Sequence, residues 1–159
     1  MAAHDTAAGR GQRARAGQPA APAGDVCLAC VLACVPAAPI VARTAVAHAL
    51  TGRVDGRVLA DAELMVSELV TNSVQHAGLS ADDFVRIGAA VTDGVLRLEV
   101  DNPGAAGTVA PRDPDAERYG FGLRIVDTLA DTWGVSRNGH TRVWVELACW
   151  PPPTDLLTA

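Results

Sequence analysis

One segment with helical periodicity constrains the fold more than any other part of the sequence. Residues 61–78 read DAELMVSELVTNSVQHAG, and a helix over them places Glu68 and Asn72 side by side on one polar face. The opposite face is apolar and consists of Ala62, Val66, Leu69, Val70 and Ala77. Leu64 and Met65 flank the polar stripe that carries Glu68 and Asn72. We therefore expect the helix to be covered on both sides, by a sheet and by a ligand or lid.

Glu68 and Asn72 offer a carboxylate and a carboxamide within reach of a single ligand. Groups of this kind at this spacing suit a general base and a metal ligand. A Glu and an Asn on one helix face more often form a solvated surface. The spacing alone does not decide between these two interpretations.

The charge of the chain excludes several classes of function. All 13 basic residues are arginine, which excludes a Walker A phosphate loop and Schiff-base chemistry on a lysine. The net charge of −5 offers no clustered positive face for nucleic acid or an anionic membrane. No apolar run approaches the roughly 18 residues that span a bilayer. We therefore expect no direct nucleic-acid or membrane partner.

The length and composition predict one folded domain between two tails. The 159 residues are 49% hydrophobic, which is enough for a single core. Residues 1–24 are rich in Ala, Gly and Pro, and we expect a disordered tail there. We expect a flexible tail over residues 151–159 as well, so that the folded body covers residues 25–150.

The first part of the body predicts a strand followed by a helix. The apolar run Val26–Val35 favours a buried strand, and Pro36 ends it. The following helix is expected over Ile40–Leu50. Its predicted inner side consists of Ile40, Val41, Ala45, Val46 and Ala49.

The second part predicts two hairpins separated by a helix. Phe84–Val91 and Val95–Asn102 are expected strands around an Asp-Gly turn, and Trp133–Ser136 and Thr141–Ala148 are expected strands around an Asn-Gly turn. Between the hairpins, residues 120–131 predict a helix with Leu123, Val126, Leu129 and Ala130 on its core side. Trp133 and Trp144 are expected in the core.

The element order predicts an α+β fold. It is a two-layer α/β sandwich with a mixed, mostly antiparallel sheet and helices on one face. The segment from Asn102 to Tyr119 has no usable periodicity, and its length is typical of a lid or binding loop. Gly120 and Gly122 follow it at a helix start, where free N–H groups can hold phosphates.

The cysteines do not predict a metal site. Cys27, Cys30 and Cys34 have a zinc-like spacing, but no Gly or Pro between them provides the turn that converging thiolates need. With Cys149 they are expected as small, reduced packing residues. Residues 31–34 also resemble a lipoprotein cleavage box, but Asp25 abuts the apolar run, which argues against secretion.

Four segments in order resemble the motifs of the GHKL ATPases, which include gyrase, histidine kinases and related proteins with the Bergerat fold. They are S67-E-L-V-T-N-S-V-Q-H76, V100-D-N-P-G104, G120-F-G-L-R-I-V-D127 and G139-H-T-R-V-W144. The closest likeness is to small bacterial serine kinases of the anti-sigma-factor type. It covers nearly the whole body, and the order of the four segments makes it specific.

The resemblance implies a role for each matched residue. Glu68 would be the general base, and Asn72 would coordinate Mg²⁺ that bridges the phosphates. Asn102 and Thr141 would belong to the adenine site, and Gly104 would let the backbone approach the base. The phosphates would be held by Gly120, Gly122 and the N–H groups of Leu123 and Arg124.

Two positions depart from the family pattern. The family reads adenine with an aspartate in V-x-D-x-G, where this chain has Asn102, with Asp101 one residue earlier. Strand alternation favours Asn102 as the residue that faces the site. Close relatives often have an arginine where Phe121 stands. Any phosphate contact from that arginine is lost here unless Arg118 or Arg124 replaces it.

The resemblance thus implies an ATP-binding regulatory protein similar to anti-sigma-factor serine/threonine kinases. ATP and Mg²⁺ are the implied cofactors, and a sigma factor and an antagonist protein with a phosphorylated serine are the implied partners. A homodimer stays open, and we expect a cytoplasmic location. The alternative is a non-catalytic nucleotide-binding switch that acts by partner binding only.

Overall fold

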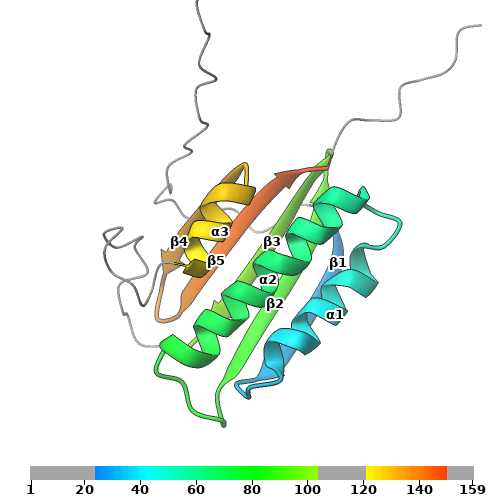
Figure 1. Ribbon diagram of the computed structural model, residues 1–159. Helices are drawn as coiled ribbons and strands as arrows, with labels where there is room; N and C mark the ends of the chain where they lie inside the picture. Colours follow the sequence, from blue (N-terminus) through cyan, green and yellow to red (C-terminus); the bar gives the residue numbers. More distant parts are fainter. Residues whose placement is uncertain (1–23, 104–120, 150–159) are drawn as a thin grey trace, which may run out of the picture.

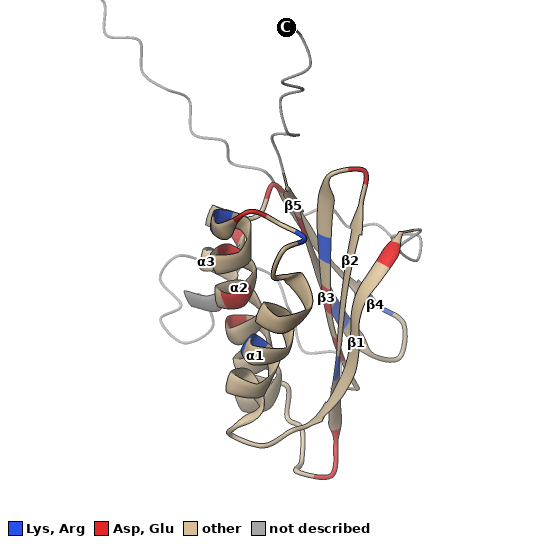
Figure 2. Ribbon diagram, turned by 90° about the vertical axis from the view of Figure 1, so that its right-hand side faces the viewer, with Lys and Arg blue, Asp and Glu red and all other residues tan. Residues whose placement is uncertain are grey.

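The computed structural model describes residues 24–103 and 121–149, which form a five-stranded sheet with three helices on one face (Figure 1). The strand order is β1-β2-β3-β5-β4, and all four pairings are antiparallel. The elements are β1 (Asp25–Ala33), α1 (Ala38–Leu50), α2 (Gly56–His76), β2 (Phe84–Thr92), β3 (Val95–Asn102), α3 (Phe121–Leu129), β4 (Thr132–Arg137) and β5 (Thr141–Ala148). Figure 2 shows the helices gathered on one side of the sheet. The predicted two-layer α+β sandwich is confirmed.

Parts of three predicted segments lie outside the described residues. They are the two tails, except for Gly24, and nearly all of the predicted lid. Within the described ranges, no helix is long and apolar enough to cross a membrane.

Two hairpin turns have the backbone conformation that their sequences predict. At the first, Asp93 and Gly94 have φ angles of 48° and 75°, which close a tight turn between β2 and β3. At the second, Gly139 has a φ angle of 76° between β4 and β5. Each turn therefore fixes the register of the two strands that it joins.

The helix α2 begins earlier than the sequence pattern predicted. Asp55 caps it, because its side-chain Oδ1 accepts hydrogen bonds from the backbone N–H groups of Arg57 at 2.9 Å and Val58 at 3.0 Å. The side that packs on the sheet and on α1 includes all the predicted apolar residues except Ala77, which lies beyond the helix end. The buried residues are Val58, Ala62, Met65, Val66, Leu69, Val70 and Ser73.

The prediction for the inner face of α1 was partly wrong. Ile40 and Val41 are 72% and 48% exposed, although both were expected to face the core. The buried stripe instead repeats every fourth residue and consists of Ala38, Ala42, Val46 and Leu50. This stripe begins with two alanines and ends with Val46 and Leu50, so Ile40 and Val41 lie outside it.

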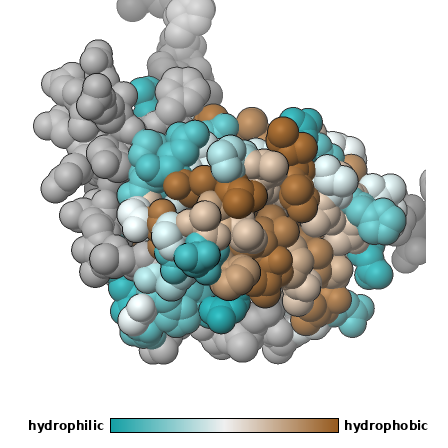
Figure 3. All heavy atoms as spheres, turned by 90° about the horizontal axis from the view of Figure 1, so that it is seen from below, coloured by the Kyte–Doolittle hydropathy of each residue, from teal (hydrophilic) through white to brown (hydrophobic). Residues whose placement is uncertain are grey.

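The first strand was also predicted to be buried, and it is not. β1 lies at the edge of the sheet, and among the strands of the described ranges only β2 pairs with it. Val26 is 63% exposed and Val31 57%, because their side of the strand carries no helix. Figure 3 shows hydrophobic residues gathered over one part of the surface seen from below.

The cysteines serve as packing residues, as expected. Cys34 is buried, and Cys27, Cys30 and Cys149 pack against the core. Burial raises the pKa of the Cys30, Cys34 and Cys149 thiols, and the nearby Asp83 charge raises that of Cys34 further. Among the described residues, no cluster of three or more His, Cys, Asp or Glu could hold a metal ion.

Candidate nucleotide-binding site

The polar stripe of α2 faces the flank opposite α1. Arg43 of α1 donates to Glu63 of α2 at 2.9 Å, which marks the flank that α1 covers. Glu68 lies five positions further along, about 140° around the helix axis from Glu63. Figure 1 shows α1 and α3 on either side of α2. Glu68 and Asn72 therefore lie on the flank toward α3.

Glu68 and Asn72 are both half-buried. Neither side chain makes a hydrogen bond or an ion pair with another described residue. Their neighbours Ser67 and Thr71 instead bond backward to carbonyl groups of the same helix, at 2.9 Å and 2.7 Å. Within the described part of the chain, the carboxylate and the carboxamide therefore have oxygen lone pairs that no other residue uses.

A cluster of buried polar residues lies where β3 ends and β5 begins. Asn102 and Thr141 are register partners on these two strands, and they are 6% and 5% exposed. The Asn102 amide Nδ2 donates to the Ser73 Oγ of α2 at 3.0 Å. Ser73 in turn donates to the carbonyl of Leu69 at 3.0 Å. This cluster joins the sheet end to the helix that carries Asn72.

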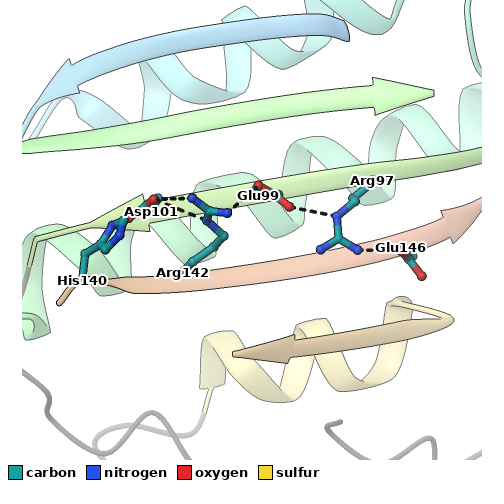
Figure 4. A network of polar contacts seen from close by, with 6 residues as sticks. All are labelled: Arg97, Glu99, Asp101, His140, Arg142 and Glu146. Carbon is teal, nitrogen blue, oxygen red and sulfur yellow. Dashed lines mark hydrogen bonds and ion pairs between the residues drawn. The ribbon is translucent and has the colours of Figure 1, made fainter. Parts of the chain in front are cut away.

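Asp101 faces the opposite side of the sheet from Asn102. Its carboxylate contacts His140 Nδ1 at 2.8 Å and Arg142 Nη2 at 3.0 Å on the helix-free face (Figure 4). Arg142 also approaches Glu99 at 3.7 Å, which continues the ion-pair network along the strands. The strand alternation predicted from the sequence is therefore confirmed, and it separates Asp101 from the cluster around Asn102.

The same network covers Trp144, which was expected in the core. Trp144 is 7% exposed, but it lies on the helix-free face, with the Arg97 guanidinium 4.5 Å from the ring centroid. Arg97 also pairs with Glu99 at 2.9 Å and Glu146 at 2.6 Å. Trp133, by contrast, lies in the core as predicted.

The predicted phosphate-binding segment is only partly described. Gly104, Gly120 and Arg118 lie outside the described residues. Gly122 lies in the first turn of α3, where Leu123 is buried and Arg124 is exposed. Helix α3 contacts α2 and β4, so its first turn and the polar stripe belong to neighbouring elements.

The side chains on α2 fit a magnesium ion whose ligands are mostly water and phosphate oxygens. Mg²⁺ usually takes one or two protein oxygens and completes its shell with water and phosphate oxygens. Asn72 offers one carboxamide oxygen and has no partner among the described residues. The free N–H groups at the start of α3 suit the phosphates themselves.

The match to known families covers this whole arrangement. The family described as histidine kinase-like ATPase domain matches residues 32–147. The chain belongs to this family. The matched range begins in β1 and ends in β5, so it includes the polar stripe of α2, the buried cluster and α3. A comparison with curated proteins gives no match.

Membership of the histidine kinase-like ATPase family agrees with the GHKL resemblance of the four motifs, and it supports ATP binding. Sequence reasoning missed Ser73, the partner of Asn102. The only signal for Ser73 in the sequence is a hydroxyl residue directly after Asn72, on the side of α2 that faces the sheet. A small polar residue there could equally have been a packing residue.

Proposed function

We propose that this chain is a Mg-ATP-binding regulatory domain of the anti-sigma-factor serine/threonine kinase type. The observation that carries the proposal is spatial. Motifs far apart in the sequence meet at one end of the sheet, where Asn102 and Thr141 pair and Ser73 of α2 bonds to Asn102. An α+β domain without a ligand would have no need for this buried polar cluster, on the same helix as Glu68, which has no side-chain partner among the described residues.

Within this proposal Glu68 is the general base. Its carboxylate takes the proton from a serine hydroxyl of the antagonist protein as that oxygen attacks the terminal phosphorus of ATP, and ADP leaves with the bridging oxygen. ATP with Mg²⁺ supplies the phosphoryl group and neutralises the phosphate charge. Asn72, one turn further along α2, holds the ion through its carboxamide oxygen.

Residues at two other elements bind the rest of the nucleotide. Asn102 and Thr141 recognise the adenine, and Gly104 leaves room for the base, as the resemblance implies. The N–H groups of α3 at Leu123 and Arg124 hold the phosphates, aided by the glycines Gly120 and Gly122. A sigma factor and an antagonist protein are the proposed partners, because the closest motif likeness is to kinases that serve them.

A second candidate function is a nucleotide-dependent switch that binds its partner without phosphorylating it. Asn102 favours this alternative, because the buried residue at the adenine position is a neutral amide where the family has a carboxylate. Phe121 favours it too, since an arginine often stands there in close relatives. Both candidates require nucleotide binding, and they differ only in phosphotransfer.

Phosphotransfer from labelled ATP to candidate antagonist proteins separates the two candidates. Glu68→Gln should lower the rate about 100-fold or more, which is the usual contribution of a general base, with little change in ATP affinity. Glu63→Gln is the matched control, because it removes a carboxylate from the flank of α2 that faces α1.

Equal rates for the wild type and Glu68→Gln would refute the role of Glu68. ATP binding without any phosphotransfer would favour the switch. A calorimetric titration that shows no binding of Mg-ATP would refute both candidates, as would an unchanged melting temperature at saturating Mg-ATP.

A further inference from the structure

The outer edge of β1 carries backbone hydrogen-bonding groups that the sheet does not use. At the end of the strand, Cys34 donates its N–H to the carbonyl of Asp83 at 3.0 Å, which fixes the phase of the pairing with β2. In an antiparallel pair, the backbone groups of successive residues point alternately toward the neighbouring strand and away from it. The groups that point away from β2 therefore belong to Ala29, Val31 and Ala33.

β1 lacks the features that usually protect such an edge. Exposed edge strands in proteins tend to be very short or to carry charged residues or proline. This strand has nine residues, and no charged residue or proline stands between Asp25 and Pro36. Val31, at its middle, is 57% exposed on the helix-free face. The edge is therefore suited to pairing with another β-strand.

Helix α1 exposes an apolar residue beside the same edge. Arg43 pairs with Glu63 of α2 at 2.9 Å, so this flank of α1 faces α2. Val41 lies two positions earlier, about 160° around the helix axis, and therefore on the flank away from α2. It is 48% exposed. Because α1 packs on the edge strand β1, this flank of the helix lies toward the open edge (Figure 1).

We propose that a second copy of this chain pairs with this edge, through an antiparallel contact between the two β1 strands across a twofold axis at Val31. Val31 then lies opposite Val31 of the second copy, and Ala29 lies opposite Ala33. The Ala33 carbonyl already accepts from the Val35 N–H at 2.8 Å. The new bonds therefore join the two Val31 residues and run from each Ala33 N–H to the Ala29 carbonyl of the other copy.

The sequence of the edge favours a second copy over another protein. A twofold axis places the strand opposite itself, so a charge near the axis would face a like charge. The run A29-C-V-L-A33 is apolar throughout and has alanine at both ends, so the contact meets no like charges and no mismatch in size. The same axis brings the two α1 helices side by side on the helix face, where the exposed Val41 flanks face each other.

The first test is the mass of the full-length protein in solution, measured by sedimentation equilibrium. The wild type should reach twice the 16.4 kDa of one chain. Val31→Lys should raise the dissociation constant of the dimer at least about 100-fold, because two ammonium groups then face each other at the axis. Val26→Lys is the matched control: Val26 is on the same strand and 63% exposed, but it lies beyond the irregularity in β1 and outside the paired stretch.

The second test locates the axis by a disulfide. The Cα atoms of a hydrogen-bonded antiparallel pair are about 5.5 Å apart, which is within the range that a disulfide spans. Under mild oxidation, Val31→Cys should form a covalent dimer well beyond the amount that the four cysteines of the wild type form. Val26→Cys should not, because position 26 would lie roughly 30 Å from its own copy.

Three results would overturn the inference. They are a mass of one chain at every concentration, a dimer that Val31→Lys leaves intact, and a dimer that Val31→Cys does not link. Hydrogen exchange at the Val31 amide tests the other occupant of the edge. Slower exchange in a monomeric chain only after an antagonist protein is added would assign the edge to that protein, and the inference would be wrong. None of these measurements requires nucleotide, so they test the dimer independently of the proposed function.

Discussion

Asp101→Asn is the sharpest test of which side of the sheet binds the nucleotide. Asp101 and Asn102 are neighbours in the sequence, but only Asn102 faces the helices. The side chain of Asp101 is 8% exposed and contacts His140 and Arg142, whose side chains are 39% and 35% exposed. Replacing the carboxylate by an amide removes the charge that faces these two partners, and Arg142 then keeps only its longer contact with Glu99, at 3.7 Å.

The burial of the Asp101 carboxylate places the expected loss of stability in Asp101→Asn between two known limits. Exposed ion pairs contribute up to about 1 kcal/mol, and breaking a fully buried pair costs about 3–5 kcal/mol. Asp101 is buried but its partners are half-exposed, so we expect Asp101→Asn to lower the free energy of unfolding by about 2 kcal/mol. For a chain of this size, that corresponds to a fall in melting temperature of about 4–8 °C.

The assay pairs a thermal melt with an ATP titration at a temperature where both proteins are folded. Asp101→Asn should lower the melting temperature and leave the dissociation constant of Mg-ATP within about twofold of the wild type. Asn102→Ala should weaken ATP binding about tenfold or more. If Asp101→Asn weakened ATP binding as strongly as Asn102→Ala, the assignment of the nucleotide to the helix side would be refuted.

Two further predictions concern stability and thiol reactivity. Asp55→Ala should lower the free energy of unfolding by about 1 kcal/mol in denaturant titrations, because the start of α2 loses its cap, and an unchanged midpoint would show that the cap contributes nothing. Cys30, Cys34 and Cys149, whose pKa values burial raises above the ordinary 9.0, should react with a thiol reagent at pH 8 at least about tenfold more slowly in the folded protein than in urea. Equal reaction rates in the folded protein and in urea would contradict the burial of these thiols. Because their pKa values are raised in the folded state, burial of the neutral thiols stabilises the fold fully below pH 9, and this stabilisation is lost as the pH rises above 9.

Local sequence signals predicted most of this fold. The Asp93-Gly94 turn fixed the central hairpin, because positive φ angles at both positions are compatible with few residue types. The periodicity of α2 was strong enough to place Glu68 and Asn72 on one flank. Both features depend only on residues close in sequence, which is why sequence patterns can reveal them.

The errors came from features that depend on the tertiary arrangement. Ile40 and Val41 were assigned to the core, but the buried stripe of α1 consists of Ala38, Ala42, Val46 and Leu50 instead. The run beginning at Val26 is apolar enough for a central strand, and only the strand order shows that it lies at an edge. Hydrophobicity alone does not report which neighbours an element has.

In the candidate site too, the sequence predicted the local features and missed those that depend on tertiary contacts. Alternation along β3 correctly predicted that Asn102 and not Asp101 faces the helices, since successive strand residues point to opposite faces. Ser73 could not be found in this way, because its role depends on a hydrogen bond across 29 residues of sequence. A buried serine in a helix has no sequence pattern of its own.

If the proposed function holds, the placement of Asn72 and Ser73 lets one helix serve both ends of the nucleotide. Consecutive helix residues point about 100° apart, so Asn72 lies on the flank toward α3 while Ser73 turns toward the sheet and Asn102. A rotation of α2 that moved Asn72 away from the phosphates would also pull Ser73 from the Asn102 amide. In the proposed function, metal binding and base recognition would therefore both depend on the position of α2. A variant that weakens the Asp55 cap should test this link, because it should affect both kinds of binding or neither.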